Sequence, residues 1–363
     1  MEKKVKNLYL GAFLIFLCLP WFFWLVLGRY ADTSNNENRT LAAMPQLNRD
    51  NWEDYPGQYE AYFNDRIPFR NELISFNSWI NYRFFQTSVN ENVILGKDKW
   101  LFYDAVTDGN PIGDYEGNLT FSDDELKAME DGALKAQDRL RKMGIELAVF
   151  IPPNKERVYA QYMPERYVCS PASRSDRMME RLAQGGVHIV NPKDSLIKQQ
   201  AKHQLYYPYD THWNQLGAYV GICSILESWE LKTADLSQLT VEESKRDGDD
   251  LANMLNLGKA VFNDSIEYHI KGNFDSETPI SDQLAHFENP DASYDKTVFL
   301  LGDSYRTAMR PGLCLYFTDV YVAGHESYAY EMLEQARPDY MIVEYIERHS
   351  DRLADIEALI FGK

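Results

Sequence analysis

The segment TVFLLGDSY, residues 297–305, is the part of the chain that decides the fold. Its short apolar run is typical of a strand that is buried on both faces. Gly302 permits a sharp turn after the strand, and Ser304 then begins a helix or loop. Because reactive groups in open α/β sheets lie just beyond the carboxyl ends of strands, Ser304 is a candidate nucleophile. A serine after Gly-Asp is also a common turn residue or helix cap, and this motif alone does not separate the two.

Apolar runs alternate with helical segments on either side of this strand. Ser122 and Glu125 form a capping box that opens a helix, and Gly144 ends it. We expect helices over residues 122–143, 173–184 and 326–336, and strands over residues 146–151, 187–190, 297–302, 319–324 and 339–346. Strands that alternate with helices predict a mainly parallel sheet that is covered on both faces.

A second chemical motif, YYPYDTHWN, occupies residues 206–214. A nucleophilic serine needs a base and a carboxylate that orients the base. In an extended loop, Asp210 can approach Nδ1 of His212 and leave Nε2 for Ser304. Two alternatives remain: an aromatic-rich structural turn, or a metal site formed by Asp210, His212 and His203.

The N-terminal segment from Leu8 to Gly28 holds 21 residues without a charge. At about 1.5 Å per residue it matches the thickness of a bilayer core. Lys3, Lys4 and Lys6 precede it, so the positive-inside rule places the N-terminus in the cytoplasm. We therefore predict a single-pass anchor in the cell membrane and an extracytoplasmic domain. A cleavable signal peptide is the alternative, but its apolar part would be too long and no convincing cleavage site follows.

The predicted organisation has three main parts. Residues 1–30 form the anchor, residues 31–50 a polar linker and residues 51–363 the α/β domain. Within the domain, residues 51–121 begin with aromatic-rich helical sequence and a short hairpin, and end in a Gly- and Asp-rich loop. Residues 232–295 show no clear periodicity and are expected to insert between core elements.

Composition excludes several classes of partner and site. The chain has 37 Lys and Arg against 55 Asp and Glu, a net charge of −18. Nucleic acid is therefore excluded as a partner, because its binding relies on clustered basic residues. Outside the apolar segment only Cys169, Cys223 and Cys314 remain, without CxxC spacing, so neither a zinc site nor a disulfide framework is indicated.

Eight segments, taken in order, resemble the SGNH-hydrolase-like domain of the alginate O-acetyltransferase family (AlgJ and AlgX) and its Gram-positive DHHW relatives. They are ENRTLAAMPQL (37–47), YEAYFNDRIPFRNELI (59–74), ILGKDKWLFY (94–103), IPPNKERVYAQYMP (151–164), DTHWNQLGAY (210–219), DGDDLANML (247–255), GDSY (302–305) and RPDYMIVEYIERH (337–349). The resemblance implies a three-layer α/β/α fold. It also implies a rearranged motif order, in which the Asp-His segment precedes the serine.

The resemblance assigns Ser304 as the nucleophile, His212 as the base and Asp210 as its partner. Asn154 then either helps to bind the oxyanion or stabilises a turn. We expect the remaining matched positions to be structural or to contact substrate. Lys155 could contact an anionic glycan, and Trp213 could stack on a sugar. Tyr305 and Arg306 flank the nucleophile.

By the same resemblance, the expected activity is O-acetyl transfer to a cell-surface or secreted polysaccharide through an acetyl-serine intermediate, without a cofactor. A membrane-bound O-acyltransferase is the implied acetyl supplier. One alternative is a carbohydrate O-acetyl esterase that uses the same three residues with water as acceptor. Another is a non-catalytic protein of polysaccharide export or assembly.

Overall fold

The computed structural model describes residues 2–30, 40–49, 51–67, 69–272, 275–281 and 284–362. The chain divides into two compact units, Met1–Asn90 with Ala252–Phe262, and Glu91–Leu251 with Asn263–Lys363. Half of the predicted linker, residues 31–39 and 50, lies outside the described residues. The boundaries predicted from the sequence remain predictions.

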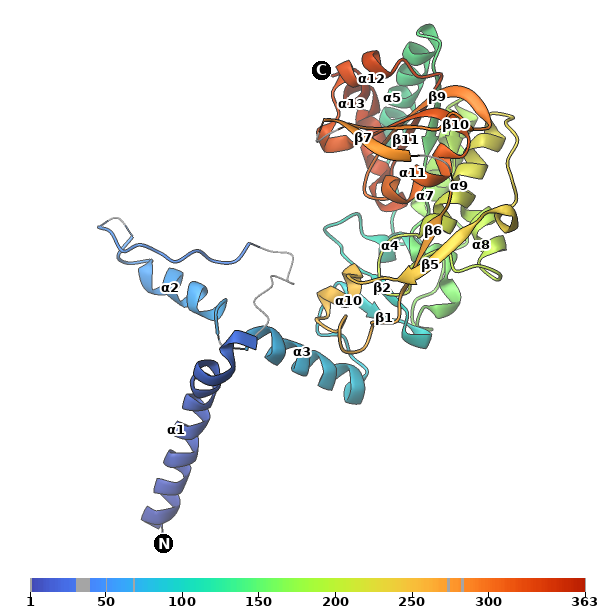
Figure 1. The fold of residues 1–363 in the computed structure, drawn as a ribbon. Helices are drawn as coiled ribbons and strands as arrows, with labels where there is room; N and C mark the ends of the chain where they lie inside the picture. The colour runs from blue at the N-terminus through green and yellow to red at the C-terminus, as the bar shows by residue number, and fades with distance from the viewer. Residues whose placement is uncertain are drawn as a thin grey trace. The chain divides into compact units, whose positions relative to one another are not determined.

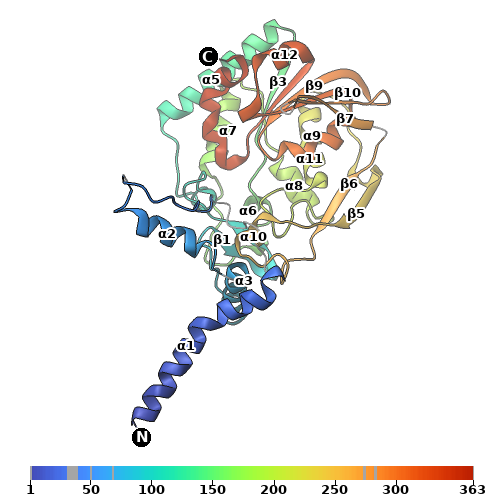
Figure 2. The same cartoon turned by 60° about the vertical axis from the view of Figure 1, so that its left-hand side comes forward.

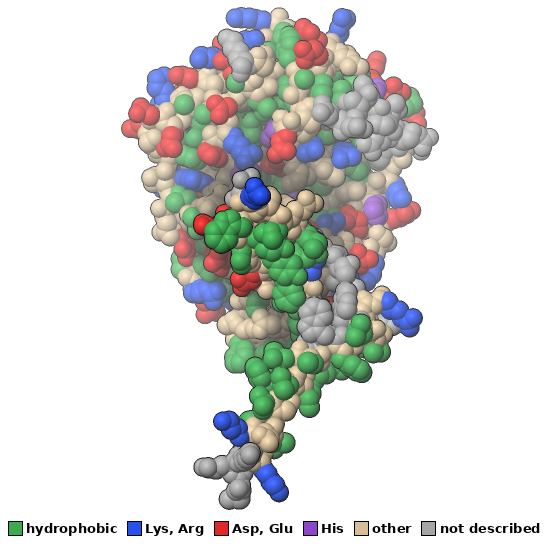
Figure 3. Space-filling view, turned by 90° about the vertical axis from the view of Figure 1, so that its left-hand side faces the viewer, with side chains coloured by type: hydrophobic (Ala, Val, Ile, Leu, Met, Phe, Trp, Pro, Cys, Tyr) green, Lys and Arg blue, Asp and Glu red, His purple; other side chains and the backbone are tan. Residues whose placement is uncertain are grey.

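The smaller unit combines helices with segments that have no regular secondary structure (Figure 1). Its helices are α1 (Glu2–Leu27), α2 (Tyr55–Asn64) and α3 (Arg70–Ile80), and α3 continues as a π-helical turn, Asn81–Phe85. Hydrophobic side chains gather along α1 (Figure 3), where Leu8, Phe16 and Leu25 are 74%, 73% and 84% exposed. Among the residues that the structure describes, none of the helices combines the length and hydropathy that a membrane crossing requires, so the predicted transmembrane helix is not supported.

The larger unit is built on a seven-stranded sheet with the order β4-β3-β11-β9-β10-β8-β7. The five strands from β4 to β10 are parallel to one another. Strand β8 pairs antiparallel with β10 on one side and with β7 on the other. The strands of this sheet are β3 (Glu146–Phe150), β4 (Ile189–Val190), β7 (Asp275–Ser281), β8 (Leu284–Glu288), β9 (Tyr294–Gly302), β10 (Phe317–Gly324) and β11 (Tyr340–Glu344). The predicted mainly parallel sheet is therefore confirmed, and the antiparallel edge makes it a mixed sheet.

Two hairpins accompany the sheet. They are β1 (Val93–Leu95) with β2 (Leu101–Tyr103), and β5 (Val241–Lys245) with β6 (Ile266–Ile270). The α-helices that follow the first hairpin are α4 (Pro111–Tyr115), α5 (Asp123–Lys142), α6 (Lys155–Val158), α7 (Arg174–Gln184), α8 (Lys193–Gln199), α9 (Gln215–Ser228), α10 (Asp250–Met254), α11 (Arg306–Cys314), α12 (Tyr330–Ala336) and α13 (Ile356–Phe361). Of these, α10 begins in the larger unit and ends in the smaller one. The predicted capping box of Ser122 and Glu125 is present at the start of α5.

Strand β9 shows why the apolar run was a reliable signal. Successive strand side chains point to opposite faces, and here both faces are covered by helices (Figure 2). Val298 and Leu300 pack in the cluster formed with α9 and α11. Phe299 and Leu301 pack in the cluster formed with α5, α7 and α13. The sheet is thus the middle of three α/β/α layers.

Candidate active site

Ser304 lies in the short turn between β9 and α11, where its side chain is exposed. Gly302 is required in this turn by close packing, because a Cβ atom there would lie 2.4 Å from Oε2 of Glu344. That same oxygen accepts a 2.9 Å hydrogen bond from the Asp303 N–H. The missing side chain therefore lets the end of β9 rest directly against the end of β11.

Asp303 fixes the conformation that presents the serine. One of its carboxylate oxygens accepts the Tyr305 N–H at 2.9 Å, and the other accepts the Ile346 N–H at 3.0 Å. The Ser304 N–H has no partner among the described residues. This N–H is therefore available to an oxyanion that develops beside Oγ.

The structure brings Ser304, His212 and Asp210 into one line of hydrogen bonds. Nε2 of His212 lies 2.7 Å from Oγ of Ser304, and Nδ1 lies 2.7 Å from Oδ1 of Asp210. The Asp-His loop is tied to the start of α9, because Asn214 accepts the N–H groups of Leu216 and Gly217. A nucleophile, a base and an orienting carboxylate are thus placed as acyl transfer requires.

The charges of this line reinforce one another. Burial raises the pKa of Asp210, but hydrogen bonds and charge from His212, together with the Arg246 charge, outweigh it and hold the pKa well below its usual range. Burial also opposes a charged His212, yet the hydrogen bond and charge of Asp210 raise the pKa of His212 above its ordinary value. Asp210 is therefore a permanent anion that stabilises an imidazolium.

Arg246 and Asp250 hold Asp210 from its other side. The Arg246 guanidinium and the Asp250 N–H each donate to Oδ2 of Asp210 at 3.1 Å. The Asp250 carboxylate accepts from the hydroxyl and N–H of Thr211 at 2.5 and 2.8 Å. We assigned neither residue from sequence, although the DGDD motif (247–250) offered a signal through its acidic cluster next to an arginine.

Asp210, His212 and Asp250 also form a group whose ligand atoms lie within 4.8 Å of one another, which is the spacing a metal ion needs. His203, part of the metal alternative, does not belong to this group among the described residues. The geometry favours proton transfer over ligation, because Oδ1 of Asp210 already accepts both Nδ1 and N of His212.

Lys155 supports the Asp-His loop from inside the protein. Its side chain is buried, and Nζ donates to the carbonyl oxygens of Tyr207, Pro208 and Asp210 at 3.2, 3.2 and 2.6 Å. The expectation that Lys155 meets an anionic glycan is therefore corrected. Burial removes it from substrate, and all three ammonium protons serve the loop.

Trp213 and Tyr305 are also buried, each 1% exposed. The Trp213 indole N–H donates to the Tyr305 carbonyl at 3.0 Å, and the Tyr305 hydroxyl donates to the Thr211 carbonyl at 2.5 Å. The two rings join the Asp-His loop to the serine turn but offer no face to a sugar. This corrects the expectation that they line the acceptor site.

Arg306 and Asn154 border the site in different ways. Arg306 donates to the carbonyls of Gly302 and Asp303, which stabilises the serine turn. Asn154 is buried just beyond β3, and its Oδ1 has no partner among the described residues. It lines a cavity of about 10 Å³ together with Thr211, Tyr305 and Arg348. That position is next to the Asp-His loop.

Fold and site together define a three-layer α/β/α protein with a serine, histidine and aspartate arranged for acyl chemistry. The chain belongs to the family described as SGNH hydrolase-like domain, acetyltransferase AlgX, which matches residues 93–309. The predicted resemblance is thereby confirmed. The match includes both the Asp-His segment and the serine turn, in the rearranged order.

Individual relatives agree with this family. The chain is 25% identical over 223 residues to a "Probable alginate O-acetylase AlgJ" of Pseudomonas syringae pv. tomato, a match that covers 61% of this chain. It covers 51% of that relative, so the chain spans about half the length of this curated protein. Two solved structures share the fold: a DHHW family protein from Eubacterium siraeum (TM-score 0.53, 16% identity, 75% of this chain and 99% of that one) and Bacillus cereus PatB1 (TM-score 0.53, 15% identity, 71% and 97%).

Proposed function

We propose that this chain is an O-acetyltransferase that moves an acetyl group through Ser304 to a hydroxyl of a polysaccharide. The observation that carries the proposal is the unbroken hydrogen-bond line from Ser304 through His212 to Asp210. Family membership and the AlgJ relative support acetyl as the group that is transferred. They also support a polysaccharide as the acceptor. A membrane-bound O-acyltransferase is the acetyl supplier that we propose.

The chemistry follows from the contacts. Oγ of Ser304 attacks the acetyl carbonyl while Nε2 of His212 takes its proton, and the Ser304 N–H stabilises the oxyanion. The leaving group departs with the proton from His212 and leaves acetyl-Ser304. A sugar hydroxyl then attacks the ester, gives its proton to His212, and Ser304 recovers it as the acetylated sugar leaves. Asp210 stabilises the imidazolium in both halves.

Replacement of the three residues tests the proposal. Ser304→Ala and His212→Ala should each lower acetyl transfer by roughly a thousandfold or more, and Asp210→Ala by somewhat less. Circular dichroism should show an unchanged fold. Full activity of Ser304→Ala on a model acetyl ester and on a native glycan would show that the serine mechanism is wrong.

Chelation separates this chemistry from the metal alternative. We predict that exhaustive treatment with EDTA leaves the rate unchanged, because the nucleophile is a serine side chain rather than a metal-bound water. The rate of ester cleavage before and after chelation is the measurement. Loss of activity that one divalent ion restores would reassign Asp210, His212 and Asp250 as ligands.

We propose further that the protein is held at the cell membrane by α1 and acts outside the cytoplasm. The proposal rests on the uncharged segment from Leu8 to Gly28, the lysines that precede it and the exposed apolar side chains of α1. Protease added to intact protoplasts should cleave the larger unit, and the full-length chain should sediment with membranes. Protection from protease or recovery in the soluble fraction contradicts this location.

A further inference from the structure

Arg348 follows β11, the strand that lies between β3 and β9 in the sheet. These three strands are parallel, so their carboxyl ends meet at one edge. Ser304 follows β9 at that edge, which is where reactive groups of open α/β sheets lie. Arg348 is therefore brought to the edge of the nucleophile by the neighbouring strand.

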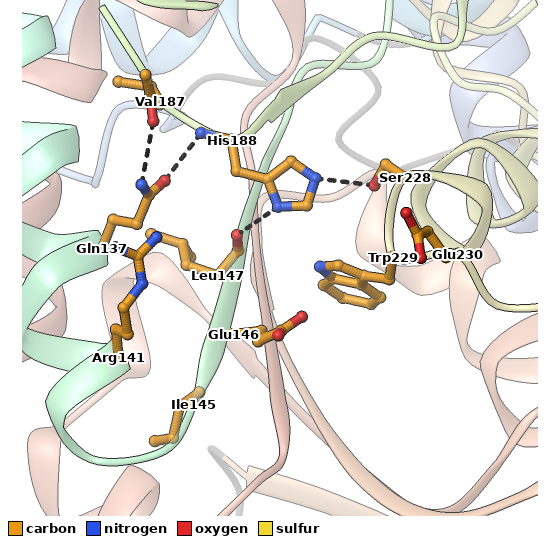
Figure 4. Close-up of a pocket in the computed structure, with 11 residues that line it drawn as sticks. Gln137, Arg141, Ile145, Glu146, Leu147, Val187, His188, Ser228, Trp229 and Glu230 are labelled. Atoms are coloured by element: carbon orange, nitrogen blue, oxygen red, sulfur yellow. Dashed lines mark hydrogen bonds between the residues drawn. The ribbon is translucent and has the colours of Figure 1, made fainter.

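A cavity of about 670 Å³ lies at the opposite edge, where β3 begins with Glu146 and Leu147 (Figure 4). Figure 4 shows the His188 ring in its wall bonded at both nitrogens, by the Leu147 carbonyl at 2.9 Å and the Ser228 hydroxyl at 3.0 Å. The length of the strands separates this cavity from Ser304. The carboxyl ends of the strands, and not the volume of a cavity, therefore mark the reactive edge.

The loop before α4 holds the backbone of Arg348 and the inner part of its side chain. Oδ2 of Asp108 accepts the Arg348 Nε–H at 3.3 Å, and Oδ1 lies 2.8 Å from Nε2 of His349. Gly109, with a φ of +78°, packs on the Arg348 carbonyl, where a Cβ atom would lie 2.1 Å from the oxygen. Arg348 is thus fixed before a substrate arrives, which electrostatic catalysis requires.

The outer part of the Arg348 side chain has donors that the protein does not use. Nη1 and Nη2 have no hydrogen-bond partner among the described residues, and neither is sealed from solvent. The side chain as a whole is only 11% exposed. A guanidinium is always charged and has five N–H donors, and burial of a charge is costly unless its donors are bonded. A ligand oxygen that accepts from these nitrogens would reduce that cost.

Arg348 also borders the cavity of about 10 Å³ that it lines with Asn154, Thr211 and Tyr305. Its Cζ atom lies 5.5 Å from the centroid of the Tyr103 ring, which belongs to the same lining. A cavity of this size admits about one water-sized group. The space beside the guanidinium therefore suits a single oxygen atom and excludes a sugar ring.

The charge of Arg348 acts on the catalytic base. Burial lowers the pKa of His212, Asp210 and Asp250 raise it, and the Arg348 charge lowers it. Since Nε2 of His212 lies 2.7 Å from Oγ of Ser304, a charge that acts on this ring also acts on the carbonyl that Oγ attacks. Surroundings of low dielectric weaken this charge less than bulk water would.

We propose that Arg348 is a catalytic residue whose terminal N–H groups donate to the acyl oxygen of the acetyl donor. The proposal rests on the proposed acetyl transfer through Ser304. As Oγ bonds to the carbonyl carbon, the electron pair of the C=O double bond moves to the oxygen, and Arg348 and the Ser304 N–H share the anion. The C=O bond re-forms when the leaving group departs. Attack by the sugar hydroxyl repeats both changes.

The burst of nitrophenol from 4-nitrophenyl acetate measures acetylation of Ser304 in the full-length protein. Arg348→Met should lower the acylation rate constant at saturating ester roughly a hundredfold, with little change in the half-saturating concentration. The acid limb of the pH profile should move to higher pH, because His212 loses a charge that lowers its pKa. Arg348→Gln also removes the charge, and it replaces Arg348→Met if thermal melting shows that Arg348→Met does not fold.

Arg352→Met is the matched control, because Arg352 is exposed on the same 3₁₀ helix, Glu347–Asp355, and should leave both readouts unchanged. The double variant Asp108→Asn/Arg348→Met tests the alternative that Arg348 only neutralises Asp108. Removal of both partners would then restore the rate, whereas loss of a catalytic cation leaves the double variant slow.

The proposal is overturned if Arg348→Met keeps the wild-type rate, if only the half-saturating concentration changes, if the acid limb stays in place, or if the double variant recovers. Absence of a burst from the wild-type protein, or a normal burst from Ser304→Ala, would instead count against the proposed function.

Discussion

Among single residues, His212 is the one whose charge decides when the enzyme can work. Only the neutral imidazole can take a proton from Ser304. Because the pKa of His212 is raised by Asp210, the neutral form appears at a higher pH than for an ordinary histidine. Asp210 thus stabilises the imidazolium at the cost of a higher working pH.

The pH profile of the acyl-transfer rate tests whether the pKa of His212 is raised. We predict that kcat/KM rises with pH and that the midpoint of its acid limb lies above 6.5, the ordinary pKa of histidine. In Asp210→Asn the raising charge is absent and burial still lowers the pKa of His212, so the midpoint should move to lower pH while the rate falls. An unshifted midpoint in Asp210→Asn would mean that another group titrates.

Lys155 is a positioning residue, and we expect its titration to set the alkaline limb of the pH profile of kcat/KM. Burial lowers its pKa to about 8, against the raising charges of Asp250 and Asp210. Above that pH the neutral amine has only two protons for three carbonyls, so the loop that carries Asp210 loosens. We predict that kcat/KM declines above about pH 8 and that Lys155→Met lowers kcat and removes this decline.

Lys127→Met is the control for Lys155→Met, because Lys127 is exposed on α5 and pairs with Asp131 on the same helix. It should leave the whole pH profile unchanged. If Lys155→Met lowers kcat but keeps the alkaline decline, Lys155 has a packing role only.

Among the helices and strands, those with strong local patterns were predictable from sequence. The apolar runs of β3, β9 and β11 and the capping box of α5 gave correct elements, because each has its cause in neighbouring residues. The β5–β6 hairpin was not predicted. Four of the five β5 side chains are exposed, so its sequence shows no alternation of apolar and polar residues.

That hairpin nevertheless supports the site. Arg246 follows β5 directly and bonds Asp210, Asp249 and Glu267 of β6. We predict that Arg246→Met lowers kcat roughly ten- to a hundredfold with little effect on KM, because Asp210 loses a partner that fixes its orientation. It should also raise the pKa of Asp210.

Lys245→Met is the matched control for Arg246→Met. Lys245 is the adjacent residue, is exposed, and pairs with Asp247 at the surface. Kinetics of the two variants, with thermal melting alongside, separate the charge lost at the site from a general effect on the hairpin. Equal losses in both variants would show that the hairpin acts only through stability.

In the whole molecule, the site joins parts that are far apart in sequence, and this limits what sequence alone can predict. Ser304, His212 and Asp210 were assigned because each lies in a recognisable motif, and the structure brings these three together. For Lys155, Trp213 and Tyr305 a structural role and a contact with substrate both stayed open, because sequence shows proximity but not the side that a side chain faces. Their burial follows from packing between layers, which no local pattern records.

The direction of the reaction is also a property of the whole molecule. Acetyl-Ser304 can be attacked by water or by a sugar hydroxyl, and Ser304 is exposed, so water reaches it. Bulk water is present at about 55 M, whereas groups held in position reach effective molarities of roughly 10⁵ M or more. Transfer therefore wins when the acceptor is held in place. We predict that an acetyl donor and an oligosaccharide acceptor give acetylated sugar faster than free acetate, measured by mass spectrometry.

Deletion of the gene tests the direction of the reaction in the cell. If the protein adds acetyl groups, the acetyl content of a surface polysaccharide should fall in the deletion strain and recover with the wild-type gene but not with Ser304→Ala. A deletion strain with raised acetyl content reverses the assignment to an esterase. Recovery with Ser304→Ala would instead favour a non-catalytic role in polysaccharide assembly, because such a role does not need the nucleophile.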